Sequence, residues 1–238
     1  MGYDEAAAAA PLASLSITHV YYDPNDRISL LCAYLALLPQ ALGVVYLTLI
    51  LSSREIEIAL LFVGQLACEA LNFVLKRLIK EERPRQIHGK GYGMPSSHAQ
   101  FVFFWSVALS LFLLVRHRPT PTSKTAAGGG GRLIERLAVS AVSLALAAAT
   151  AWSRIYLNYH TPKQVFVGSA VGALTAVAWF VFTAVLRGSG LLAWGLDLPI
   201  MRAFRVRDLV VEEDLSEAGW DRWEEKRLAK KAKGAKAQ

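Results

Sequence analysis

Apolar residues gather in long blocks along the chain, and nearly all charges fall between the blocks. The blocks with at most two acidic residues and no basic ones are 28–51, 56–75, 99–115, 137–152 and 165–186. A helix needs about 20 mostly apolar residues to cross the hydrocarbon core of a membrane. Four blocks reach that length with their flanks, and 137–152 reaches it when it is extended back to Leu133. The pattern therefore predicts five transmembrane helices.

The predicted fold is an all-α, polytopic membrane helix bundle. A sixth apolar stretch, residues 190–200, is too short to span the membrane and contains Asp197, so we expect it at the membrane interface. We divide the chain into a flexible N-terminal segment (1–27), a membrane domain (28–186) and an interfacial segment with a basic tail (187–238). The composition agrees, because 54% hydrophobic residues are too many for an ordinary soluble domain.

The formal net charge of +7 does not indicate a nucleic-acid partner, because the basic residues lie in the connections and the tail, as in membrane proteins. Contact of the tail with anionic lipid headgroups remains open. The third connection (116–132) carries four basic residues and no acid, and it lies on the same side of the membrane as the tail. The positive-inside rule predicts that this side is cytosolic. The second (76–97) and fourth (153–163) connections lie on the opposite side.

Candidate chemistry gathers in these two opposite-side connections. The second connection contains six basic residues and two acids, and the fourth adds Arg154 and His160. Lys, Arg and His without a cluster of Cys or Asp are not a typical metal-ligand set. They suit a phosphate, because a guanidinium group can bind two phosphate oxygens at once. Headgroup contact is the alternative, and we favour it for Arg77, Lys80, Arg85 and Lys90.

The stretch PSSH, residues 95–98, precedes the third apolar block and predicts a helix N-terminus. The first N–H groups of a helix have no intrahelical partners, and the helix dipole favours an anion there. The hydroxyl groups of Ser96 and Ser97 add donors. A plain N-cap role is the alternative for these serines, but it does not explain His98 beside them at the membrane edge.

Three motifs in this region resemble the signatures of the type 2 phosphatidic acid phosphatase superfamily. They read K-x6-R-P, P-S-S-H and S-R-x5-H, and their residues are Lys76, Arg83, Pro84, 95–98, Ser153, Arg154 and His160. Their order and spacing match the family pattern over roughly residues 76–164. Ser97 replaces the usual glycine and Gln164 the usual aspartate of the family. Both departures resemble the dolichyl diphosphatase branch.

The resemblance implies a phosphatidic acid phosphatase type 2/haloperoxidase-like core and a role for each motif residue. His160 would be the nucleophile that forms a phosphohistidine, and His98 the general acid. No metal or other cofactor is expected, because protein cations would neutralise the phosphate. The expected phosphate-binding residues are Lys76, Arg83, Ser96, Ser97 and Arg154.

Four further residues are expected to support this site, namely Gln164, Glu69, Ser153 and Pro84. In the family the aspartate orients the nucleophilic histidine and stabilises its charge. Gln164 can accept the imidazole N–H but brings no charge. Residues 161–164, TPKQ, also read as a helix capping box, and both roles carry equal weight.

Glu69 lies in the middle of a predicted span, where an ionisable group is costly. It shares one helical face with Gln65, Asn72 and Lys76. We expect this polar face to point into the bundle, with Glu69 acting on Lys76. A plain polar contact between helices is the alternative for Glu69.

The resemblance implies an enzyme of the endoplasmic reticulum membrane that hydrolyses dolichyl diphosphate to dolichyl phosphate and phosphate. The reaction would recycle the lipid carrier of protein N-glycosylation, with the active site lumenal and the tail cytosolic. Two alternatives remain, namely a phosphatase for phosphatidate, a sphingoid phosphate or another isoprenyl diphosphate, and a non-catalytic lipid-phosphate binder. The sequence does not indicate an oligomeric state.

Overall fold

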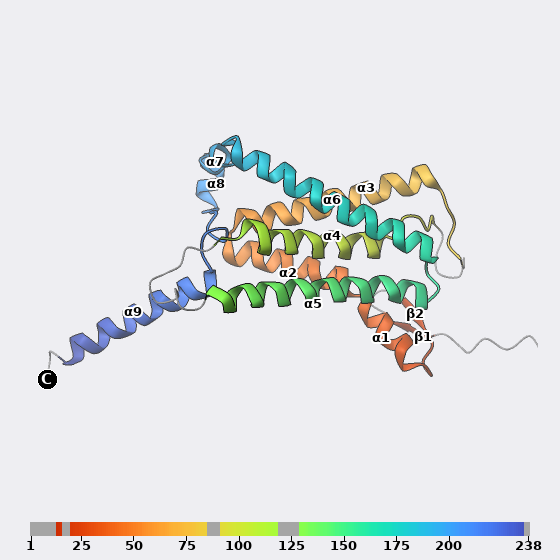
Figure 1. Ribbon diagram of the computed structural model, residues 1–238, viewed down its shortest axis with the longest axis horizontal. Helices are drawn as coiled ribbons and strands as arrows, with labels where there is room; N and C mark the ends of the chain where they lie inside the picture. Colours follow the sequence, from red (N-terminus) through yellow and green to blue (C-terminus); the bar gives the residue numbers. More distant parts are fainter. Residues whose placement is uncertain (1–12, 16–19, 85–90, 119–128, 236–238) are drawn as a thin grey trace, which may run out of the picture.

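The computed structural model describes residues 13–15, 20–84, 91–118 and 129–235. Within these residues the chain is a bundle of long helices with one small β-hairpin (Figure 1). The segments long and apolar enough to cross a membrane are Arg27–Ser53, Ile56–Ile79, Ser97–Arg116, Leu133–Tyr156 and Pro162–Gly188. The prediction of an all-α bundle with five membrane spans is therefore confirmed.

The described elements follow one another in a simple order. They are β1 (Ala13–Leu15), β2 (Val20–Tyr22), α1 (Arg27–Leu35), α2 (Leu38–Ser53), α3 (Ile56–Ile79), α4 (Ser97–Leu111), a π-helical turn (Phe112–Arg116), α5 (Gly129–Tyr156), α6 (Pro162–Gly188), α7 (Leu191–Leu196), α8 (Pro199–Ala203) and α9 (Leu215–Ala235). The sixth apolar stretch forms α7 and α8, each too short to span a membrane.

The first span differs from the uninterrupted helix that its apolar block predicts. It consists of α1 and α2, which are separated by a turn at residues 36–37. Pro39 stands in the first turn of α2. A proline has no backbone N–H to continue the hydrogen bonds of a preceding helix, so it breaks a helix that reaches it and is tolerated at the beginning of the next. The break lies close to the candidate site.

The N-terminal hairpin is a second element that the apolar pattern does not reveal. Strands β1 and β2 pair antiparallel, with Ser14 opposite Tyr21. The hairpin is fastened to the chain after α5, because Tyr21 N donates to the Tyr159 hydroxyl over 2.8 Å. The Tyr156 hydroxyl donates to Asp26 at the beginning of α1. These contacts place residues 20–26 at the same end of the bundle as the fourth connection.

Helix α4 is the centre of the bundle and packs against α3, α5 and α6 (Figure 1). Its approach to α6 is close enough to require glycine. A Cβ atom on Gly168 would lie 2.6 Å from the Ser96 carbonyl oxygen, and one on Gly172 would lie 2.2 Å from the Gln100 carbonyl oxygen. Glycines four residues apart let two membrane helices pack backbone against backbone.

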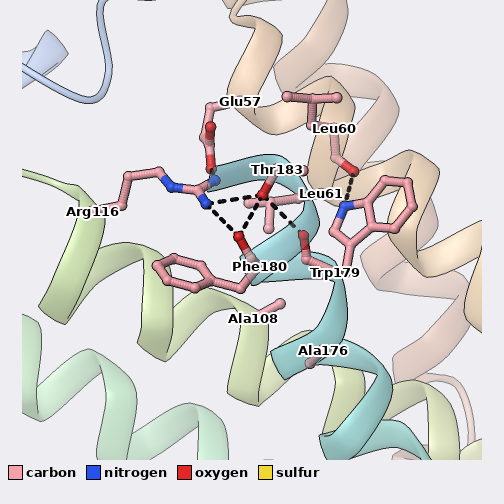
Figure 2. Close-up of a pocket in the computed structure, with 9 residues that line it drawn as sticks. All are labelled: Glu57, Leu60, Leu61, Ala108, Arg116, Ala176, Trp179, Phe180 and Thr183. Carbon is pink, nitrogen blue, oxygen red and sulfur yellow. Dashed lines mark hydrogen bonds and ion pairs between the residues drawn. The ribbon is translucent and has the colours of Figure 1, made fainter. Parts of the chain in front are cut away.

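A buried ion cluster closes the end of the bundle that lies away from the fourth connection. Glu57 of α3 accepts hydrogen bonds from Arg116 and Arg187. Figure 2 shows that Arg116 also donates to the Phe180 carbonyl oxygen and to the Thr183 hydroxyl, beside a small cavity. A carboxylate buried in this way is stable only when its charge is balanced by such partners.

The segment after α8 is bound to the same end. The Glu55 carboxylate accepts hydrogen bonds from the backbone N–H groups of Leu209 and Val210. Arg118 N donates to the Val211 carbonyl oxygen over 2.8 Å. The first and third connections and the C-terminal segment therefore share one end of the bundle, as the alternation of spans requires.

We expect Gly172→Ala to destabilise the protein by about 1–3 kcal/mol, because the new methyl group would overlap the backbone of α4. Thermal unfolding in detergent micelles measures the effect. Gly43→Ala in α2 is the matched control, since a Cβ atom there meets nothing within 4 Å. Equal unfolding midpoints for the two variants would show that α4 and α6 tolerate a wider spacing.

Candidate active site

The three sequence motifs meet at the end of the bundle opposite the Glu57 cluster. The first motif begins in the last turn of α3, the second begins α4, and the third joins the end of α5 to the beginning of α6. These helix ends lie together on the right of Figure 1, whereas α9 extends from the other end. The alternating direction of the spans thus brings the second and fourth connections to one membrane edge.

Ser96 occupies the N-cap position of α4, but its side chain caps nothing. It is buried, and its hydroxyl oxygen has no hydrogen-bond partner among the described residues. Its backbone N–H donates to the Gln164 carbonyl oxygen over 3.1 Å, which ties the second motif to α6. The plain N-cap interpretation therefore does not describe this serine. Ser97, the first residue of α4, is only partly buried.

His98 points from α4 towards the break in the first span. Its Nε2 atom lies 3.1 Å from the Ala36 carbonyl oxygen, in the turn between α1 and α2. A carbonyl oxygen only accepts hydrogen bonds, so Nε2 carries a proton. Nδ1 remains available to exchange a proton with a ligand. His160, Arg154 and Lys76 lie within electrostatic range of this imidazole.

Arg154 lies near the end of α5 and is 2% exposed. Its guanidinium carbon stands 4.2 Å from the centre of the Tyr159 ring. Its Nε and Nη1 atoms have no hydrogen-bond partner in the part of the chain that the structure describes. Buried donors are almost always satisfied, so such a group calls for a ligand with acceptor oxygens. Ser153 points elsewhere, since its hydroxyl donates to the Thr150 carbonyl oxygen.

His160 is 3% exposed and is surrounded by positive charge. Burial, followed by the charges of Arg154 and Arg83, lowers its pKa to about 3, while the hydrogen bond with Gln164 acts in the opposite direction. Lys76 contributes in the same sense as the arginines. The imidazole is therefore neutral at neutral pH. The first and third motifs thus supply three cations around one neutral histidine.

Gln164 makes both of the contacts that the sequence leaves open. Its Oε1 atom lies 3.2 Å from His160 Nδ1, and Thr161 N donates to the same oxygen over 3.3 Å. Thr161 Oγ1 accepts from Gln164 N, which completes the capping box. Nε2 donates to Glu81 Oε1 over 3.0 Å and to the Glu82 carbonyl oxygen over 2.7 Å. These two acceptors assign the amide orientation, so His160 Nδ1 is the donor to Oε1.

The remaining predicted residues are Arg83, Pro84 and Glu69, together with the basic residues expected to contact lipid headgroups. Arg83 is partly buried at the site and burial lowers its pKa, whereas Pro84 is exposed. Glu69 is partly buried, and its Oε1 atom has no hydrogen-bond partner among the described residues. No ion pair within 4 Å joins Glu69 to Lys76 in this part of the chain. Of the four basic residues expected to contact lipid headgroups, Arg85 and Lys90 lie outside the described residues.

The polar face of α3 points into the bundle, as expected, and it holds the second motif in place. Asn72 Nδ2 donates to Gln100 Oε1 over 2.8 Å and to the Pro95 carbonyl oxygen over 3.4 Å. Gln100 Nε2 donates to the Cys68 carbonyl oxygen over 2.7 Å. Sequence reasoning missed Gln100, although its position three residues after Ser97 in an apolar span could have indicated it. Ala36 and Glu81 were also missed, because nothing in their local sequence indicates a distant partner.

Comparison with known proteins agrees with this geometry. A model of the PAP2 superfamily matches residues 57–187, which is more than half of the chain. The chain belongs to the PAP2 superfamily. The matched region includes all three motifs and the helices that carry them.

Similar proteins share one name. The chain is 56% identical to the putative dolichyldiphosphatase of Neurospora crassa, over 93% of this chain and 95% of the relative. It is 33% identical to the dolichyldiphosphatase of Saccharomyces cerevisiae over 91% of each chain, and 38% identical to dolichyldiphosphatase 1 of Homo sapiens over 82% and 81%. No solved structure matches the chain. Family, relatives and spans together support a multi-pass membrane lipid phosphatase.

The lowered pKa of His160 predicts that its imidazole is still neutral at pH 5 in the ligand-free protein, where a histidine with an ordinary pKa of about 6.5 is mostly protonated. The ¹⁵N shifts of the imidazole in labelled protein report its charge. The same residue in urea-unfolded protein is the control and should titrate near its ordinary pKa. Titration near 6.5 in the folded protein would contradict the cationic surroundings described above.

The lowered pKa of His160 also predicts how the free energy of unfolding depends on pH. Between the folded-state pKa of about 3 and the unfolded value, the unfolded chain binds more protons at His160. The free energy of unfolding should therefore fall as the pH drops below about 6.5.

Proposed function

We propose that the protein hydrolyses the terminal phosphoanhydride bond of a polyprenyl diphosphate, with dolichyl diphosphate as the principal substrate. The products would be dolichyl phosphate and inorganic phosphate. The observation that carries the proposal is a set of buried donors near a neutral, buried His160. Arg154 Nε, Arg154 Nη1 and the Ser96 hydroxyl have no hydrogen-bond partner among the residues that the structure describes. The dolichyldiphosphatase name of its relatives supports the choice of lipid.

The nucleophile in this mechanism is Nε2 of His160. Its Nδ1 proton is held by Gln164 Oε1, which leaves the Nε2 lone pair free. Nε2 attacks the terminal phosphorus, the bond from that phosphorus to the bridging oxygen breaks, and a phosphohistidine forms. Water then attacks the phosphohistidine and releases inorganic phosphate.

His98 is the general acid of the first step. Its Nε2–H stays on the Ala36 carbonyl oxygen, so the proton for the bridging oxygen comes from Nδ1 of the doubly protonated ring. In the second step the neutral Nδ1 takes a proton from the attacking water. Dolichyl phosphate leaves between the two steps.

The phosphoryl oxygens are bound by the cations and donors around the two histidines. Arg154 and Arg83 offer guanidinium groups, Lys76 a point charge and Ser96 a hydroxyl. The N-terminal N–H groups of α4, at Ser97 and the residues after it, add the positive end of a helix dipole. Fixed donors of this kind stabilise a transition state because they need no reorganisation.

The lipid geometry fits a site at the membrane edge. A diphosphate headgroup can reach the motifs at the helix ends while its isoprenoid tail stays among the spans or in lipid. The basic third connection and tail lie at the other end of the bundle, which the positive-inside rule makes cytosolic. The site would then face the lumen of the endoplasmic reticulum, where the carrier lipid of N-glycosylation is released.

The test is phosphate release by the purified protein in detergent from dolichyl diphosphate, dolichyl phosphate and phosphatidate. We expect the diphosphate to be the preferred substrate and a chelator to have no effect. His160→Asn and His98→Asn should each lower kcat by about 1000-fold or more, because nucleophile and acid act as a unit. His117→Asn, at the other end of the bundle, is the control for histidine substitution.

Three outcomes would contradict the proposal in whole or in part. Wild-type release from His160→Asn would exclude this nucleophile. Absence of release from every lipid by the folded wild-type protein would favour a lipid-phosphate binder. Preference for phosphatidate would keep the mechanism and change the substrate.

A further inference from the structure

Glu81 is a carboxylate that reaches the nucleophile through one side chain. Its Oε1 atom accepts a hydrogen bond from Gln164 Nε2 over 3.0 Å, and Oε1 of the same amide lies 3.2 Å from His160 Nδ1. The series carboxylate–amide–imidazole therefore joins the loop after α3 to His160 in the connection before α6. Glu81 stands at one of the six unspecified positions of the first motif, K-x6-R-P.

The local fold holds Glu81 against this amide. Lys80 is the C-cap residue after α3, and its φ of 55° turns the chain sharply before Glu81. The Glu81 carbonyl oxygen accepts from Gly93 N over 2.7 Å. A Cβ atom on Gly93 would lie 2.8 Å from the Gln164 amide, so a larger residue there would displace this amide. The second connection thus closes over Gln164 from two sides.

Charge is what Glu81 adds at this position. Burial and then the cations Arg154, Arg83 and Lys76 lower the pKa of His160, and Gln164 itself is neutral. Hydrogen bonds from Lys163 and Gln164 hold the pKa of the Glu81 carboxyl below its ordinary value, so it is ionised at neutral pH. A carboxylate that accepts from one end of an amide polarises it and strengthens acceptance at the other end.

A purely structural role explains the contact less well. The orientation of the Gln164 amide is already set by the Glu82 carbonyl oxygen and by Thr161 N. The ion pair of Glu81 with Lys163 spans 3.0 Å, but the lysine side chain is 69% exposed. An exposed pair of this kind contributes little to stability.

We propose that Glu81 is a positioning residue that acts on His160 through Gln164 and supplies the negative charge that the amide lacks. It stabilises the positive charge that His160 acquires when its Nε2 bonds to phosphorus. This role rests on the phosphohistidine chemistry proposed above. Gln164 takes the place of the usual aspartate, and the carboxylate of Glu81 lies on the far side of its amide.

The kinetic test compares Glu81→Gln, which keeps the shape and removes the charge, with Glu82→Gln. Glu82 is the matched control because it is the neighbouring acid, its side chain is exposed, and it accepts a hydrogen bond from Gln164 through its backbone oxygen, which the substitution retains. We expect Glu81→Gln to lower kcat about tenfold with KM within about twofold, and Glu82→Gln to leave both within about twofold. Unfolding midpoints establish that both variants are folded.

A double-mutant cycle with Gln164→Ala tests the route of the effect. Once the amide is removed, Glu81→Gln should change kcat by less than about twofold. Two results would overturn the proposal, namely the same tenfold loss on the Gln164→Ala background, or equal effects of Glu81→Gln and Glu82→Gln. Either result would show that Glu81 is an ordinary acid of the loop and does not act on His160 through Gln164.

A spectroscopic measurement separates this proposal from the proposed function. The ¹H resonance of the His160 Nδ1–H group, assigned with His160→Asn, reports the strength of its hydrogen bond to Gln164 without any substrate. We expect the resonance to move upfield in Glu81→Gln and to stay in place in Glu82→Gln. An unmoved resonance in Glu81→Gln overturns the role of Glu81 even if the enzyme is active. If the wild type hydrolyses no lipid, the proposed function fails and this measurement still decides the coupling.

Discussion

The close approach of α4 and α6 determines where every other part of the site can lie. Gly168 and Gly172 let α6 pack on the backbone of α4, within van der Waals contact of the Ser96 and Gln100 carbonyl groups. His98 lies in the first turn of α4, and His160 precedes α6 by two residues, so the same packing brings both histidines to one membrane edge. A wider spacing would also break the hydrogen bond from Ser96 N to the Gln164 carbonyl oxygen. Helix packing within the membrane therefore sets the geometry of chemistry at its surface.

Among the described residues, the buried arginines pair with carboxylates at one end of the bundle, whereas Arg154 at the other end does not. At the C-terminal end, Arg116 and Arg187 share the Glu57 carboxylate, and Arg187 also pairs with Asp208. At the other end, the buried guanidinium of Arg154 faces an aromatic ring and leaves two nitrogens without a hydrogen-bond partner among the described residues. Buried charges without partners are costly. The energetic cost of burying the Arg154 charge therefore falls at the end of the bundle where an anionic ligand can offset it.

The sequence predicts the spans well, and it identifies the helix ends that meet, but it predicts the contacts of the connections poorly. The five spans follow from the length of apolar blocks, and the motifs identify the ends of α3, α4 and α5 that meet. The break at residues 36–37 was missed because Pro39 is compatible with either a kinked or a broken helix. Glu81 was missed because its partner, Gln164, is 83 residues away. The hairpin β1–β2 was missed because six residues of strand carry little periodicity.

Gln164 illustrates why such contacts are beyond sequence reasoning. At a position where the family carries an aspartate, a glutamine reads as a lost charge, and the capping box offers a sufficient reason for it. In the folded chain, one side chain caps α6, accepts from His160 and donates to two groups of the second connection. An aspartate, shorter by one methylene and without a donor, could not make the last two contacts. The glutamine therefore replaces a direct charge with a bridge, and it makes His160, the proposed nucleophile, depend on the contacts of Glu81 and Glu82 with α6.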